Sequence, residues 1–207
     1  MRKYVKTLQA LVATTIVLSA LVGTASANRR STSSRNIRAT WTALEFIDAF
    51  GTTVRCPLTL EGSLHSAVIT KTLGALIGHI TRGTINSAGC AAGGFTILQA
   101  NLPWHVRYNG FQGTLPNITA VRTTVINMAF RLQSPSGTCL FLTTATQPLS
   151  MQLNRAAGGG LTSAVLSGTI TSSEACVFGA RTNISLAGTS ATLTQLGLAG
   201  GITVTLI

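Results

Sequence analysis

Apolar and polar residues alternate with a period of two along much of this chain. The clearest case is the segment 126–133, where the apolar positions on one face are Ile126, Met128, Phe130 and Leu132. Segments 58–65, 104–109 and 202–206 alternate in the same way. Because successive side chains of a β-strand point to opposite faces, this period predicts strands with one buried face.

Turn-forming sequences separate these predicted strands, among them Asn109-Gly110, Ser134–Gly137 and Gly158–Gly160. Short strands joined by frequent turns, without helices alternating between them, favour an antiparallel β-sandwich or β-barrel. We therefore predict an all-β fold in a single domain that extends over residues 39–207.

A helix near residues 69–78 remains an alternative, because the apolar residues there would share one helical face: Ile69, Leu73, Leu76 and Ile80. Two glycines in the same segment, Gly74 and Gly78, weaken this interpretation, since glycine destabilises a helix interior. The pattern alone does not decide between helix and strand at this place.

The first 27 residues have the features of a secretory signal peptide. A basic start (Arg2, Lys3 and Lys6) precedes the largely apolar run 8–22, and the small residues 24–27 suit cleavage. An uncleaved membrane anchor is the alternative, because residues 8–27 could just span a bilayer. We expect a secreted protein, either free or retained at the cell surface, with no transmembrane segment after the signal.

Four cysteines follow the predicted signal: Cys56, Cys90, Cys139 and Cys176. An even number of cysteines in an exported chain favours disulfides, because the extracellular compartment is oxidising. Three pairings are possible. We favour Cys56–Cys90 with Cys139–Cys176, since sequential pairs close local loops, and the other two pairings stay open.

Basic residues outnumber acidic ones by 15 to 4, which gives a formal net charge of +11. The segment 28–38 carries four arginines and few apolar residues, and we expect it to be a disordered arm; these are Arg29, Arg30, Arg35 and Arg38. The arm could bind an anionic cell-envelope polymer, or it could be solvated without a partner. A specific nucleic-acid partner is not expected.

One group of polar residues could carry chemistry. Glu61 and His65 share a face of one predicted strand, and His105 and Arg107 share a face of another. Along one strand Glu61 and His65 would be about 13 Å apart, too far for an acid–base pair. If the two strands pair, however, the four side chains could line one patch. That patch would be either a small hydrolytic or ligand-binding site, or a solvated sheet face.

The sequence contains neither a GxSxG nucleophile motif nor an HExxH zinc motif. Cysteines in disulfides cannot act as nucleophiles. Three imidazoles would suit Zn²⁺, but the spacing of His65, His79 and His105 is not diagnostic of a site. We therefore assign no metal site and no cofactor.

Three functional hypotheses follow. The first is an exported, non-enzymatic β domain with a binding or structural role at the cell surface. The second is a small exported hydrolase that uses Glu61, His65 or His105. The third is a carrier of a small apolar ligand, which predicts an interior cavity of about 300 Å³ or more lined by aliphatic and aromatic side chains.

Overall fold

The computed structural model describes residues 30–48, 51, 53–90, 94–114, 117–134, 137–156, 159–173, 183–188, 190–197 and 202–206. The predicted signal peptide lies outside these residues. Strands dominate the described part, together with two short 3₁₀ turns at Ser87–Gly89 (η2) and Gln99–Asn101 (η3). The predicted all-β class is confirmed. Within the same ranges, no helix has the length and apolar character needed to cross a membrane.

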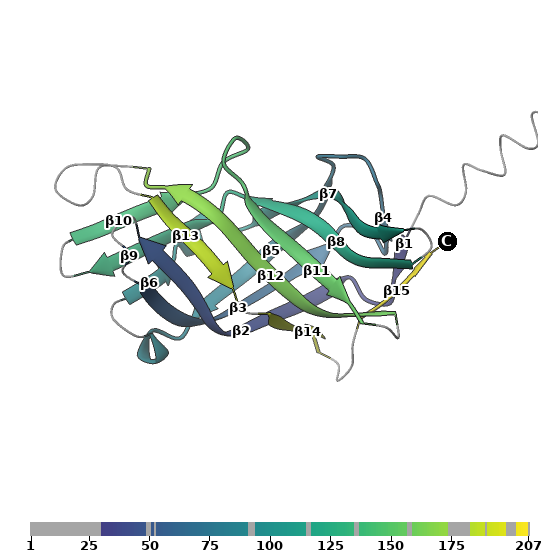
Figure 1. Cartoon of the computed structure of the whole chain (residues 1–207), viewed down its shortest axis with the longest axis horizontal. Helices are drawn as coiled ribbons and strands as arrows, with labels where there is room; N and C mark the ends of the chain where they lie inside the picture. Colours follow the sequence, from purple (N-terminus) through teal and green to yellow (C-terminus); the bar gives the residue numbers. More distant parts are fainter. Residues whose placement is uncertain are drawn as a thin grey trace, which may run out of the picture.

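Eight antiparallel strands form a closed barrel (Figure 1). Around the barrel these are β2 (Asn36–Asp48), β3 (Thr53–Leu64), β5 (Leu76–Ile85), β7 (Trp104–Thr114), β8 (Asn117–Ile126), β11 (Leu149–Arg155), β12 (Gly160–Thr171) and β13 (Asn183–Gly188). Pairing of β13 with β2 closes the ring. The short strand β14 (Ala191–Gln195) also pairs with both β12 and β2. It pairs with the parts of these two strands that do not pair with β13.

The alternating pattern places one apolar face of each strand inside the barrel. In β3 the buried positions are Val54, Cys56, Leu58, Leu60 and Leu64. The residues between them are polar or partly exposed. Each aliphatic side chain that is fully buried contributes about 1.5–3 kcal/mol of transfer free energy. The period of two in the sequence therefore distinguishes the residues that face the barrel interior from those that face outward.

A second sheet lies at one end of the barrel (Figure 1), built from β6 (Gly94–Ile97), β9 (Ala129–Ser134) and β10 (Gly137–Leu142). Aromatic rings join it to the barrel. Phe46 stacks on Phe95 with ring centroids 3.6 Å apart, and Phe130 meets Trp104 edge-on at 5.5 Å. This aromatic cluster fills the barrel end that the second sheet covers.

Three short strands lie at the other end: β1 (Arg30–Thr32), β4 (Val68–Ile69) and β15 (Ile202–Leu206). β1 pairs with both β15 and β4, and β15 pairs with β12. Residues 30–32 and 36–38 were expected to lie in a disordered arm, but here they belong to β1 and β2. The expectation of disorder is not met for them, because backbone pairing with strands distant in sequence orders the segment.

One predicted disulfide, Cys56–Cys90, is present. It joins β3 to Cys90, the residue that follows η2. It is the one disulfide among the described residues, where two had been expected over the whole chain. Cys139 is buried in β10, and its expected partner Cys176 lies outside the described residues. The second bridge therefore stays a prediction.

Two local predictions need correction. The possible helix near 69–78 is absent: the chain forms a loop followed by β5, and Leu73 is 72% exposed.

The segment 126–133 is not one strand, because a turn at Asn127, with φ of 65°, separates β8 from β9. The buried contacts of Met128 with Thr143, which accepts a hydrogen bond from the Met128 amide at 2.8 Å, stabilise that turn.

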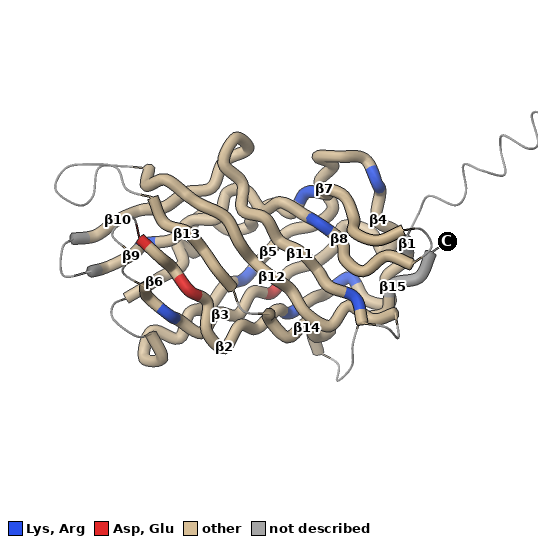
Figure 2. Tube along the Cα trace, viewed as in Figure 1, with Lys and Arg blue, Asp and Glu red and all other residues tan. Residues whose placement is uncertain are grey.

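Charged residues are sparse and spread along the barrel, as Figure 2 shows. The described acidic residues lie on β2 and β3. Glu45 forms an ion pair with Arg55 at 2.7 Å. Exposed pairs of this kind add little stability, commonly less than about 1 kcal/mol.

Candidate functional site

The two strands that carry the predicted polar patch are not neighbours. β5 lies between β3 and β7. Its residue His79 is paired with Ser63 on one side and with His105 on the other. The condition set for the patch, direct pairing of these two strands, is therefore not met. His79, which had been considered only as part of a zinc site, lies between them.

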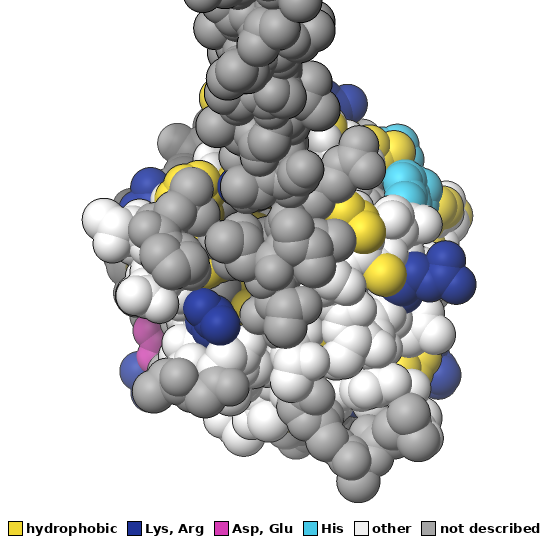
Figure 3. Space-filling model, turned by 90° about the vertical axis from the view of Figure 1, so that its right-hand side faces the viewer, with side chains coloured by type: hydrophobic (Ala, Val, Ile, Leu, Met, Phe, Trp, Pro, Cys, Tyr) yellow, Lys and Arg dark blue, Asp and Glu magenta, His cyan; other side chains and the backbone are white. Residues whose placement is uncertain are grey.

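The three histidines form a row on the outer wall of the barrel. Nε2 of His65 lies 2.8 Å from Nδ1 of His79, within hydrogen-bond distance. The ring centroids of His79 and His105 are 5.0 Å apart. His65 is exposed and the other two are half-buried, and Figure 3 shows histidine side chains on the molecular surface (cyan).

The environment lowers the pKa of His79 below its ordinary value of 6.5. Partial burial is the main cause, because it disfavours the charged imidazolium. The neighbouring His65 and His105 add repulsion to a positive charge on the ring. The centre of the row is therefore biased toward a neutral imidazole.

Glu61 has different partners from those expected of a catalytic acid. Its carboxylate accepts a hydrogen bond from Nε of Arg38 at 2.8 Å, and Nη1 of Arg82 lies 3.9 Å from its other oxygen. Two cations thus hold this carboxylate. The last member of the expected patch, Arg107, has a buried Nε without a hydrogen-bond partner among the described groups.

The basic residues of the expected arm are dispersed. Arg38 is tied to Glu61 in an ion pair at 2.7 Å, Arg35 is exposed between β1 and β2, and Arg30 lies in β1. Arg29 falls outside the described residues. Binding of an anionic envelope polymer by these residues stays a prediction.

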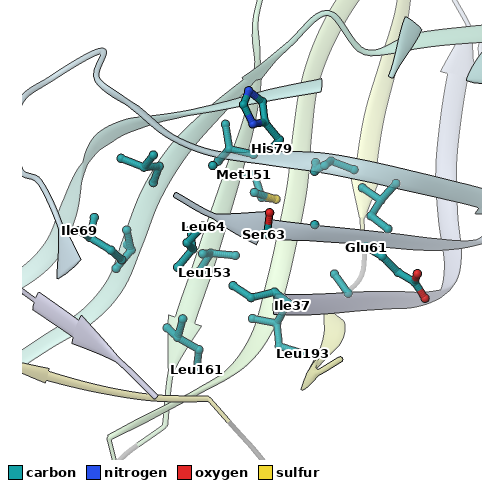
Figure 4. A pocket seen from close by; sticks show the side chains of 18 residues that line it. Ile37, Glu61, Ser63, Leu64, Ile69, His79, Met151, Leu153, Leu161 and Leu193 are labelled. Atoms are coloured by element: carbon teal, nitrogen blue, oxygen red, sulfur yellow. The ribbon is translucent and has the colours of Figure 1, made fainter. Parts of the chain in front are cut away.

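The barrel interior contains an apolar cavity of about 60 Å³ (Figure 4). Aliphatic side chains from β2, β3, β5, β7, β8, β11, β12 and β14 line it, among them Ile37, Leu60, Val106, Met151, Leu153 and Leu193. Ile69 of β4 borders it at the end occupied by the three short strands. Glu61 and His79 border the cavity too, but their side chains point away from it (Figure 4).

The size and lining of this cavity limit its chemistry. Its volume falls well below the roughly 300 Å³ expected for a drug-sized ligand. The aliphatic walls offer few hydrogen-bond partners, so water would gain little by entering. A narrow apolar group is the kind of occupant that such walls favour. Sequence patterns could not reveal the cavity, because it depends on how side chains from nine strands fill the interior.

No model of a known protein family matches the chain, and neither a curated protein nor a solved structure matches it significantly. The functional argument therefore rests on the geometry of the barrel itself.

Proposed function

We propose that this chain is an exported, non-enzymatic binding protein whose barrel takes up a narrow apolar group, such as the end of an alkyl chain. The observation that carries the proposal is the aliphatic cavity inside the closed barrel. Eight-stranded barrels have interiors that side chains just fill or that hold one small ligand. The cavity in this barrel favours the binding of a small ligand.

The cavity volume sets the size of the ligand group. A water molecule occupies about 30 Å³ in the liquid, and an apolar cavity of about 150 Å³ can bind benzene. A volume of about 60 Å³ suits a group of a few carbon atoms. The remainder of a longer ligand would lie outside the cavity or would require side chains to move.

The positions of the candidate catalytic groups favour a binding role over hydrolysis. Arg38 and Arg82 neutralise the Glu61 carboxylate, and the histidine row lies on the convex outer wall. A general base needs a substrate held within hydrogen-bond reach, and a concave surface normally provides this.

Export is supported by the signal-like N-terminus and by the Cys56–Cys90 disulfide, since such bonds persist in oxidising compartments.

The test is a titration of the full chain with n-alkanols of increasing length, followed by methyl NMR of the cavity-lining residues. We expect saturable shifts in Met151 and Leu153. Ala39→Leu should abolish them by filling the cavity, and Leu193→Ala should enlarge the cavity and favour longer alkanols. Leu132→Ala is the matched control, because Leu132 is buried in β9 and is not among the cavity residues.

Two results would refute this function. One is the absence of saturable binding to the unmodified chain by any alkanol. The other is binding that persists unchanged in Ala39→Leu, which would place the ligand elsewhere. Circular dichroism of each variant would establish that the barrel is intact before binding is compared.

A further inference from the structure

The fold gathers every histidine of the chain in one place. The chain has three histidines, and they come from the end of β3, from β5 and from β7. Antiparallel pairing sets His79 directly opposite His105, and His65 reaches His79 from the other side. This convergence is independent of the cavity, because the imidazoles lie on the outer wall.

We propose that the outer-wall histidine row binds a divalent transition-metal ion, with His65 and His79 as its two principal ligands. Imidazole nitrogen is a preferred ligand of Cu²⁺, Ni²⁺ and Zn²⁺. The chemistry therefore points to this group of ions rather than to Mg²⁺ or Ca²⁺, which prefer oxygen ligands.

The spacing of the two nitrogens is close to what one ion requires. Metal–imidazole bonds of about 2.0–2.1 Å place two ligands at a right angle about 2.9 Å apart. The observed separation between His65 Nε2 and His79 Nδ1 is 2.8 Å. A tetragonal Cu²⁺ or Ni²⁺ ion, whose neighbouring ligands are at right angles, thus needs only a small change in this distance.

Ion binding replaces the hydrogen bond between the two rings. Each ligating nitrogen must offer its lone pair, so the protons reside on the other nitrogens, Nδ1 of His65 and Nε2 of His79. Both rings must also turn until their lone pairs meet at the ion. His65 is exposed and follows the end of β3, which leaves its ring room to turn.

Two imidazoles do not complete a coordination sphere. Among the described residues, no group of three or more His, Cys, Asp or Glu side chains is close enough to hold an ion as it stands. Water can supply the remaining ligands at this exposed position. His105, whose ring centroid lies 5.0 Å from that of His79, is placed to join as a third ligand after a side-chain rotation.

The backbone beneath the row is held closely together. A Cβ atom on Gly62 would collide with the carbonyl oxygen of His79, and one on Gly78 would lie 2.6 Å from the carbonyl oxygen of Ser63. Glycine at both positions lets β3 and β5 approach more closely than larger residues allow. The two strands thus hold His65 and His79 at a short distance before any ion binds.

The experiment uses the full chain without an affinity tag, stripped with a chelator and titrated with Cu²⁺, Ni²⁺, Zn²⁺ and Mg²⁺ by calorimetry. We expect one Cu²⁺ per chain, weaker binding of Ni²⁺ and Zn²⁺, and no binding of Mg²⁺. Loss of an outer-shell partner typically costs about 10- to 100-fold in metal affinity. His65→Gln and His79→Gln remove ligands, so each should cost at least as much.

The variant in which all three histidines are replaced by glutamine is the matched control for binding by the chain terminus and backbone. Loss of affinity in His105→Gln would support the three-ligand form of the site, and unchanged affinity would support the two-ligand form. The proposal is overturned if Cu²⁺ binds the triple variant as tightly as the natural chain, or if His65→Gln and His79→Gln have no effect. Imidazole ¹⁵N shifts on Zn²⁺ addition test the same point without a substitution.

Discussion

His65 and His79 share a hydrogen bond, Nε2 to Nδ1 at 2.8 Å, although 14 positions separate them in the chain. The pairing of β3 with β5 brings them together: Ser63 lies opposite His79, and His65 follows two residues later. Because one nitrogen of the pair must donate and the other accept, the contact requires at least one neutral ring. This hydrogen bond is therefore lost at a pH low enough to protonate both rings.

We expect the free energy of unfolding to fall as the pH is lowered below about 6.5. The pKa of His79 is lowered in the folded barrel from its ordinary 6.5. Between the folded and unfolded pKa values the unfolded chain therefore binds more protons, and stability rises with pH across that window. Above it, this group makes no further contribution to the pH dependence.

Urea unfolding at a series of pH values, with a chelator present, measures this effect. The natural chain should lose more stability between pH 7 and pH 5.5 than the His79→Gln variant does. His105→Gln removes one repulsive neighbour and should give an intermediate dependence. Identical pH profiles for the natural chain and His79→Gln would show that the ring does not contribute.

The close approach of β3 to β5 gives a second prediction. Gly62→Ala introduces a Cβ against the backbone of His79 and Ile80, which cannot move aside as a flexible side chain can. We expect a loss of about 3 kcal/mol, at the upper end of the usual cost of overpacking. Thermal and urea unfolding would measure it.

Gly94→Ala is the control for that substitution. Gly94 also lies in a strand, but the nearest atom to an added Cβ is 3.7 Å away, in ordinary contact with Gln133. Its replacement should change stability little. Equal effects of Gly62→Ala and Gly94→Ala would mean that the strand spacing at Gly62 is not the cause.

Removal of the Cys56–Cys90 bridge should cost about 4 kcal/mol, from the chain entropy of an unfolded loop of this length. The two cysteines are separated by 34 positions. The double variant Cys56→Ala/Cys90→Ala would give this cost in urea unfolding. Reduction of the natural chain provides a comparison that leaves both side chains in place. A cost below about 1 kcal/mol would show that the unfolded chain is already restricted there.

The sequence predicted the strand faces well where burial alternates locally. The strands at 58–64 and 104–108 have the predicted inward residues, including Leu60, Trp104 and Val106. The prediction failed at 126–133 because the alternation continues through a turn. Asn127 adopts its left-handed conformation there, and Met128 contacts Thr143, a residue that the local pattern does not reveal.

The candidate site was only partly predictable for a related reason. His65 and His105 were expected on two strands whose pairing the sequence left open. Strand order depends on the whole topology, and β5 lies between them. The ambiguous segment around Gly74 and Gly78 concealed β5 and its histidine. The ion pairs of Glu61 were likewise out of reach, because Arg38 had been expected in a disordered arm.

The final prediction concerns Cys139. The last residues described before Cys176 lie beside β10, the strand that contains Cys139. The amide of Ser173 donates a hydrogen bond to the carbonyl oxygen of Leu140 at 2.8 Å, and Phe141 forms an isolated bridge with Ser172. Three residues extend at most about 10 Å, so Cys176 is within reach of β10. We predict a Cys139–Cys176 disulfide. Peptide mapping of the unreduced protein should yield a linked pair containing these two cysteines, and an alkylated Cys139 in that map would contradict the prediction.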